Sequence, residues 1–146
     1  MSSANSCYIA SPLFSAAEKE FNQVLATAIE ENMRVFLPQR DGALLTELLG
    51  KGVHPDAAGR QIAADDLRAI RTSSAVVAVL DGQTIDEGVA FEVGFAHALG
   101  IPCIGLITDP RRTTLGFVNP MVSFARHATV TSKDELLDIL HAVCAR

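Results

Sequence analysis

Hydrophobic residues along this chain alternate between short continuous runs and longer stretches with helical spacing. Short runs bounded by turn residues are typical of buried strands. Five of them predict strands, at residues 7–11, 34–38, 75–80, 103–107 and 127–130. Residues 75–80 are apolar at every position, which favours a central strand covered on both faces.

The stretches between these runs predict helices. Phe14, Ala17, Phe21, Val24 and Ala28 recur at spacings of three and four, which predicts an amphipathic helix with these side chains on its buried face. Further helices are expected from residue 61 to about 72, over 88–99, and after a capping box at 132–135 through 143. Residues 39–59 are expected to form a loop interrupted by a short helix at 43–49.

Strands thus alternate with helices along the chain, which predicts one α/β domain over residues 1–146. Its expected architecture has three layers around a mostly parallel sheet, as in flavodoxin-like and Rossmann-like folds. Ligands of such folds bind beyond the carboxyl ends of the strands. Candidate chemistry is therefore expected just after Ser11, Pro38, Leu80 and Ile107.

Composition narrows the classes of function. The chain has 146 residues, of which 49% are hydrophobic, and a net charge of −5, which argues against binding to a nucleic-acid polymer. No apolar run is long enough to span a membrane, and the polar N-terminus does not resemble a signal peptide. Cys7, Cys103 and Cys144 show no metal-ligand or disulfide spacing, so we expect a cytoplasmic protein without a metal site.

Two carboxylates fall where helices should be apolar. Asp66 is four residues from both Ile62 and Ile70, so it lies on the predicted buried stripe. Glu92 is one turn into a helix that is otherwise apolar apart from His97, and Gly88 on the same face would allow a ligand to approach. A charge on an apolar face is either paired or functional.

The loop before that helix holds two more acids. Asp81 is expected only to close the strand that it follows, whereas Asp86 is either a helix N-cap or a ligand-binding group. Gln39, Arg40 and Asp41 follow the second strand, and we select Gln39 as a further substrate-binding candidate.

Three segments together resemble nucleoside 2-deoxyribosyltransferases. They are residues 8–14 (YIASPLF), 66–70 (DLRAI) and 86–94 (DEGVAFEVG), in an order and at spacings that match the family over nearly the whole chain. The resemblance implies an enzyme that cleaves the N-glycosidic bond of a 2′-deoxynucleoside and transfers the deoxyribose to another nucleobase, with no cofactor.

The same resemblance implies roles for individual residues. Glu92 corresponds to the nucleophile, Tyr8 to the tyrosine that positions it, and Asp66 to the proton shuttle near the base. Asp86 corresponds to the residue that holds the sugar 5′-hydroxyl. The first matched segment adds Phe14 as a substrate-binding candidate, and also Ser11, although the family often has glycine at that position. Asn119 corresponds to an asparagine that reaches a neighbouring site, which implies a homo-oligomer, with a dimer as the minimum and a hexamer as a further alternative.

The chemistry calls for the same residue types. Cleavage with retention needs a carboxylate that attacks C1′, and we expect Glu92 to stay ionised for this at the start of its helix. The departing base needs a proton, which a partly buried Asp66 with a raised pKa could supply.

Alternatives to a transferase remain open from the sequence. One is an N-glycoside hydrolase of deoxynucleosides or of nucleoside 5′-monophosphates, and another is a non-catalytic nucleotide-sensing domain on the same fold. An ionised Asp86 would repel a phosphate and so favours nucleosides. Against this, Ser11, Arg111 and Arg112 could form an anion site.

Overall fold

A single parallel sheet forms the centre of the molecule. The computed structural model describes residues 5–109, 111 and 119–145. Its five strands run in the order β2-β1-β3-β4-β5, and each neighbouring pair is parallel. The strands are β1 (Ser6–Ala10), β2 (Arg34–Phe36), β3 (Ala75–Val79), β4 (Cys103–Leu106) and β5 (Ala128–Val130). This order is that of flavodoxin-like doubly wound folds.

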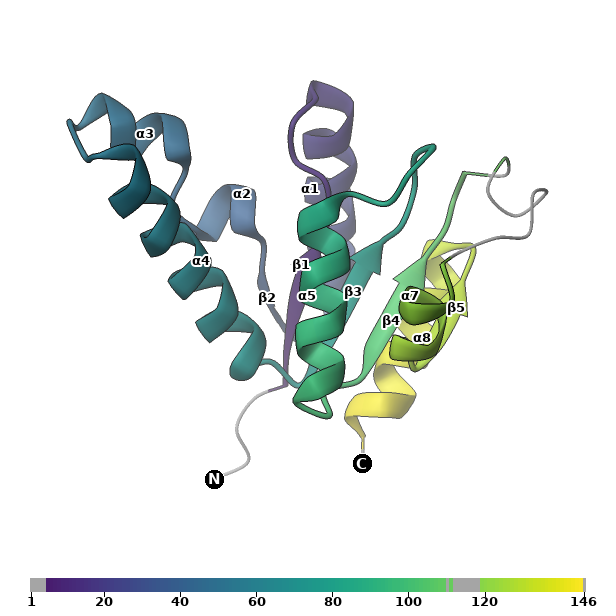
Figure 1. Cartoon of the computed structure of the whole chain (residues 1–146). Coiled ribbons are helices and arrows are strands. Elements are labelled where there is room, and N and C mark those ends of the chain that lie inside the picture. Colours follow the sequence, from purple (N-terminus) through teal and green to yellow (C-terminus); the bar gives the residue numbers. More distant parts are fainter. Residues whose placement is uncertain (1–4, 110, 112–118, 146) are drawn as a thin grey trace.

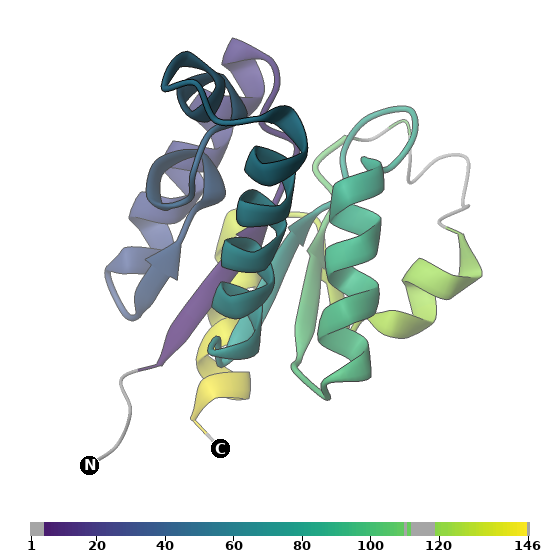
Figure 2. The same cartoon turned by 60° about the vertical axis from the view of Figure 1, so that its left-hand side comes forward.

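Helices cover both faces of the sheet, which gives the three predicted layers (Figures 1 and 2). They are α1 (Ala16–Glu30), α2 (Pro38–Asp41), α3 (Leu45–Gly50), α4 (Pro55–Arg71), α5 (Glu87–Ala98), α7 (Pro120–Ala125) and α8 (Lys133–Cys144). Helices α1 and α8 pack on one face, whereas α4, α5 and α7 pack on the other. None of the described helices is long and apolar enough to cross a membrane.

Alternating side chains of each strand divide the core into two clusters. Cys7 and Ile9 of β1 pack with Leu25 and Ile29 of α1 on one face. Tyr8 and Ala10 point to the opposite face, where Val89 and Val93 of α5 cover them. The period-two alternation of strand side chains therefore turns Tyr8 toward the helix that carries Glu92.

The first helix forms as predicted, but its predicted buried face is wrong. The buried residues of α1 are Asn22, Leu25, Ala26 and Ile29. Val24 is 56% exposed, and Phe14 precedes the helix and is 75% exposed. Ser15 caps the helix and Glu18 completes a capping box, so the helix starts after Phe14.

Helical structure is also more extensive than predicted around prolines. Pro38 was expected to end a strand, but it occupies the first turn of α2. Pro55 likewise opens α4, which begins six residues before the predicted start at residue 61. Proline is favoured in a first turn because its missing N–H has no helical partner there. Pro120 similarly begins α7, a helix that the sequence did not predict.

Candidate active site

A pocket of about 270 Å³ lies on the α4–α5 face, at the carboxyl end of β1. This is near the lower end of the range of small-molecule sites. Its walls come from the segment after β1, from α2 and α3, from α4, and from the start of α5. They comprise Ser11, Leu13, Phe14, Pro38, Ala43, Leu44, Leu45, Ile62, Asp66, Asp86, Gly88, Val89 and Glu92.

Tyr8 and Glu92 form the central polar contact of this region. The Tyr8 hydroxyl donates a hydrogen bond of 2.5 Å to Oε1 of Glu92. The Tyr8 ring is fully buried and stacks on Phe36, with ring centroids 5.7 Å apart. A hydrogen bond from a side chain held this firmly fixes the orientation of the carboxyl group.

Burial dominates the protonation of Glu92. Loss of solvent raises the pKa of Glu92 to about 8, the hydrogen bond from Tyr8 opposes this, and the negative charges of Asp66 and Asp86 add to it. Our expectation that Glu92 stays ionised is therefore wrong at neutral pH. The start of a helix favours a carboxylate, but it does not offset burial against an apolar core.

Asp66 faces the same pocket without a partner. It makes no hydrogen bond or ion pair with the residues that the structure describes, whereas its neighbour Asp65 pairs with Arg68 at 3.1 Å. Burial, with a smaller contribution from the charge of Asp65, raises the pKa of Asp66 to about 6. The pairing of Asp66 with an arginine, one of the two sequence-based alternatives, does not occur among the described residues.

Asp86 both caps a helix and lies at the pocket, which are the two positions that the sequence suggested for it. Its Oδ1 accepts a hydrogen bond of 3.0 Å from the backbone N–H of Val89, so it caps α5, and its side chain also lines the pocket. A Cβ atom at Gly88 would lie 3.1 Å from Oδ1 of Asp86. Glycine at this position therefore leaves room beside the carboxylate.

Ser11 and Phe14 complete the pocket near the end of β1. Ser11 is only 7% exposed, and its Oγ is buried without a hydrogen-bond partner among the described residues. Buried hydroxyls are normally paired, so Ser11 Oγ is free to bind a polar ligand atom. Phe14 exposes most of its ring at the pocket wall.

Two predicted substrate-binding residues do not line the pocket. The Gln39 amide is used within the protein: its Oε1 accepts from Asn22 and its Nε2 donates to the carbonyl oxygen of Lys19, both at 2.9 Å. Gln39 therefore links α2 to α1. Its position does not support the predicted role in binding substrate. Asn119 is exposed and caps α7 through a hydrogen bond from Met121.

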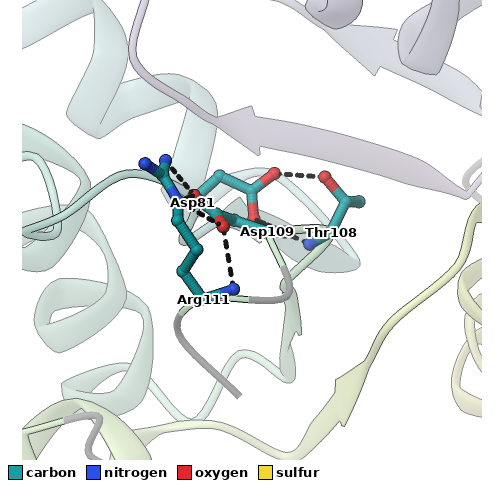
Figure 3. A network of polar contacts seen from close by, with 4 residues as sticks. All are labelled: Asp81, Thr108, Asp109 and Arg111. Carbon is teal, nitrogen blue, oxygen red and sulfur yellow. Dashed lines mark hydrogen bonds and ion pairs between the residues drawn. The ribbon is translucent and has the colours of Figure 1, made fainter. Parts of the chain in front are cut away.

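Asp81 has the structural role that the sequence favoured (Figure 3). Its carboxylate accepts hydrogen bonds from the backbone N–H groups of Thr108 and Asp109, which ties the end of β3 to the end of β4. Arg111 pairs with Asp109 at 2.6 Å. This pairing weakens the case for an anion site formed with Ser11, and Arg112 lies outside the described residues.

The apolar side of the pocket was not identified from the sequence. Leu44 and Leu45 at the start of α3 and Ile62 of α4 line it together with the three carboxylates. The predicted short helix at 43–49 was the available signal, but its apolar residues are equally typical of core. No group of three or more His, Cys, Asp or Glu side chains within the described residues has the arrangement of a metal site.

Comparison with known proteins relates this chain to one family. The sequence model of the nucleoside 2-deoxyribosyltransferase family matches residues 7–139. No curated protein matches the chain. A conserved protein from Enterococcus faecalis V583 has a similar structure, with 30% identity and a TM-score of 0.79 over 93% of this chain and 96% of that one.

Two further solved structures share the fold at lower identity. A 2-deoxyribosyltransferase from Bacillus psychrosaccharolyticus has 18% identity and a TM-score of 0.72, over 91% of this chain and 90% of that one. A CMP N-glycosidase from Clostridium botulinum has 18% identity and a TM-score of 0.52, over 93% of this chain and 98% of that one.

Proposed function

This chain belongs to the nucleoside 2-deoxyribosyltransferase family, and we propose that it transfers 2-deoxyribose from a 2′-deoxynucleoside to a free nucleobase. The observation that carries this proposal is the Tyr8–Glu92 hydrogen bond in a pocket shared with Asp66 and Asp86. A fixed carboxyl beside a second, unpaired carboxyl is what retaining cleavage of a glycosidic bond requires.

In the first step, the ionised Glu92 attacks C1′ of the donor. A bond forms between a Glu92 carboxylate oxygen and C1′, and the C1′–N bond breaks with its electron pair passing to the base. Asp66 gives its proton to that base as the base departs. Asp66 suits this role because burial keeps its pKa at about 6, closer to neutrality than that of an exposed aspartate.

In the second step, the acceptor base attacks C1′ of the glycosyl ester from the face that the first base left. The ester bond breaks and returns its electron pair to Glu92, while Asp66 recovers a proton from the acceptor nitrogen. Two displacements at C1′ give overall retention. Tyr8 orients Glu92 throughout and stabilises the carboxylate that is regenerated.

The walls of the pocket suit the two halves of a deoxynucleoside. Leucine and isoleucine side chains with the exposed Phe14 ring offer an apolar surface for a planar base. The Asp86 carboxylate and the unpaired Ser11 hydroxyl offer hydrogen bonds to the sugar hydroxyls. We therefore assign base contacts to the apolar wall and sugar contacts to Asp86 and Ser11.

Hydrolysis of a nucleoside monophosphate is the second candidate function, because the C. botulinum CMP N-glycosidase shares this fold. In this chain Asp86 lines the site, and a carboxylate within hydrogen-bonding range of a phosphate would repel it. Arg111, which could offset that repulsion, is paired with Asp109. The charges at the site thus favour nucleosides.

We further propose that the active enzyme is a homo-oligomer in which Asn119 completes the site of a neighbouring subunit. Support comes from the exposed apolar side chains beside Asn119 and on α5: Phe124 is 84% exposed, Met121 80% and Phe91 63%. Such a patch is unusual on a protein that remains a monomer.

One chromatographic assay tests the reaction. The protein is incubated with deoxyinosine and adenine, with deoxyinosine alone, and with deoxyinosine monophosphate alone. A transferase forms deoxyadenosine only when adenine is present. Release of hypoxanthine at an equal rate without adenine, or from the monophosphate only, would instead establish a hydrolase.

A further inference from the structure

Arg126 is a half-buried arginine on the α5 side of the sheet, following α7. Its side chain lies directly over β4: a Cβ atom at Gly105 would come within 2.7 Å of Cδ of Arg126 and 2.9 Å of Cδ1 of Leu80. Gly105 is therefore the residue that gives the arginine its place against the sheet. No larger side chain fits there without moving Arg126.

The charge of Arg126 has no counterpart among the described residues. Its Nε donates to the carbonyl oxygen of Val122 at 3.1 Å, and one terminal nitrogen donates to Oγ1 of Thr129 at 2.6 Å. It forms no ion pair with a described residue, and all 17 Asp and Glu side chains belong to the described part of the chain. Burial accordingly lowers the pKa of Arg126.

An unpaired half-buried cation is costly unless something outside the chain compensates it. A guanidinium has five N–H donors in a planar fork, and within the described part of the chain Arg126 makes two hydrogen bonds to protein atoms. Donors therefore remain for an external acceptor. Oxyanions match the fork best because two of their oxygens can accept in parallel.

A second pocket, of about 340 Å³, lies against this arginine. His97 from α5 and His127 at the end of the α7–β5 connection line it together with Arg126. Both imidazoles can donate hydrogen bonds, and no Asp or Glu lines the pocket. The carboxyl end of α5 carries a negative partial charge that Arg126 and the two imidazoles must outweigh, although the carbonyl oxygens of Ala96 and His97 are engaged by the N–H groups of Ile101 and Gly100.

This pocket is separate from the candidate active site. Cys103, which begins β4, forms part of its lining, whereas the active-site pocket lies at the carboxyl end of β1. The two pockets share no residue, although α5 contributes Glu92 to one and His97 to the other. The arginine and two histidines are thus not explained by the proposed transfer reaction.

We propose that this second pocket binds a small phosphate-type oxyanion through Arg126, with His97 and His127 as additional hydrogen-bond donors. The phosphate comes from inorganic phosphate or from the phosphate group of a nucleotide. Both sources present the same tetrahedral oxyanion to Arg126. The site does not depend on the proposed transfer reaction, so either can fail alone, although Phe124 belongs both to its wall and to the apolar surface proposed as a subunit contact.

The chain provides its own internal controls for a test by NMR. It has four histidines, of which His97 and His127 line the pocket while His54 and His141 do not. We would follow the imidazole proton signals of the wild-type protein during titration with inorganic phosphate, at constant pH and ionic strength. Assignments would come from single His→Gln variants.

The expected result is a saturable shift of the His97 and His127 signals, with His54 and His141 unchanged. Arg126→Gln should raise the dissociation constant for phosphate tenfold or more. Arg60→Gln, which removes an exposed charge from α4, should leave that constant unchanged. A parallel titration with adenosine monophosphate separates the sources: tighter saturation than with phosphate would identify a nucleotide.

Several results would overturn the proposal. Equal drift of all four histidine signals would exclude the site, and so would the lack of a saturable shift with either phosphate compound. Both of these results come from titrations of the wild-type protein, so they do not depend on a variant that folds. Equal shifts with acetate would exclude selectivity for a phosphate-type anion. Shifts that depend on protein concentration rather than on phosphate would show that a carboxylate of a second copy pairs with Arg126.

Discussion

The hydroxyl of Tyr8 on β1 donates a 2.5 Å hydrogen bond to Oε1 of Glu92 on α5, and so links the sheet to the helix that covers it. The two residues are 84 positions apart in the sequence. Parallel pairing of β1 with β3 makes this contact, because α5 directly follows β3 and packs back over β1. The position and protonation of Glu92 therefore depend on both β1 and α5.

Replacement of Glu92 by glutamine should lower the transfer rate by about a thousandfold or more, because an amide cannot serve as the nucleophile. The folded protein should at the same time become more stable at alkaline pH. Burial raises the pKa of Glu92 in the folded protein to about 8, whereas the ordinary value for a glutamate is 4.5. Between these pH values Glu92 ionises in the unfolded chain but not in the folded protein, so rising pH favours unfolding.

We expect the gain in unfolding free energy of Glu92→Gln to be about 1–3 kcal/mol at pH 8 and to vanish below pH 4. Chemical denaturation at several pH values measures it. Equal stability of the two proteins across this range would mean that Glu92 is not a buried acid.

Replacement of Tyr8 by phenylalanine should change the pH profile of kcat/KM in a defined way. The wild-type profile should be bell-shaped, with limbs near pH 6 and pH 8, because Asp66 must hold a proton while Glu92 has lost one. Tyr8 lowers the pKa of Glu92. Its loss should move the alkaline limb upward by about one pH unit and reduce the maximum roughly tenfold.

Phe36 provides the matched control, since Phe36→Leu removes the ring that stacks on Tyr8 but leaves the Tyr8 hydroxyl in place. Its profile should keep the wild-type limbs. A Tyr8→Phe enzyme with unchanged limbs would show that the hydrogen bond does not control the protonation of Glu92.

Replacement of Asp66 by asparagine should abolish the alkaline limb, since no proton is then needed on this side chain. The rate should rise with ionisation of Glu92, whose pKa falls when the charge of Asp66 is removed. A donor with a cationic base, such as an N7-methylated purine deoxynucleoside, needs no proton on departure and should be affected least.

Asp65→Asn is the control for this test, because Asp65 is adjacent but pairs with Arg68. It should retain both limbs, with the limb set by Asp66 moved slightly downward because the charge of Asp65 contributes to the raised pKa of Asp66. An equal loss of rate by Asp66→Asn for neutral and cationic leaving bases would remove Asp66 as the proton donor.

Replacement of Asp86 by serine should weaken the use of deoxynucleosides roughly tenfold to a hundredfold and allow cleavage of 5′-monophosphates. Serine can still cap α5, so the helix start should be retained. Asp86→Asn, which removes the charge but keeps an acceptor, separates the two effects. Unchanged preference in the serine variant would contradict the assignment of Asp86 to the 5′-hydroxyl.

Mixing two inactive variants tests whether subunits share a site. Asn119→Ser retains the cap of α7 but shortens the side chain, and Glu92→Gln lacks the nucleophile. If Asn119 acts in a neighbouring site, mixed oligomers contain some sites with both native residues and should recover part of the activity. Mixtures no more active than their components would contradict a shared site.

Sequence patterns predicted the order of strands and helices because buried strands of a parallel sheet are continuous apolar runs. Four of the residues singled out from these patterns and from the family resemblance, Asp66, Asp86, Gly88 and Glu92, line one pocket, and Tyr8 contacts it through its hydrogen bond to Glu92. They did not predict the buried face of α1, because Asn22 is polar yet buried. Its amide donates to the carbonyl of Pro12 and to Gln39, partners that only the folded chain provides.

That same contact explains why Gln39 does not line the pocket: its amide is engaged by Asn22 and Lys19 on α1, 17 and 20 positions away in the sequence. The protonation of Glu92 was also beyond sequence reasoning. Its helix position favours a charge, and only the packing of α5 on the sheet shows how much solvent it loses. Pairings and burial that depend on distant segments cannot be read from local spacing.

Covalent attachment of Glu92 to C1′ of the sugar can be detected by mass spectrometry. The wild-type protein is acid-quenched during turnover of deoxyinosine without an acceptor, and its peptides are then mapped. We predict a 2-deoxyribosyl adduct on the peptide that contains Glu92, which disappears when adenine is added before the quench. An adduct on another residue, or none while hypoxanthine is being released, would contradict the account.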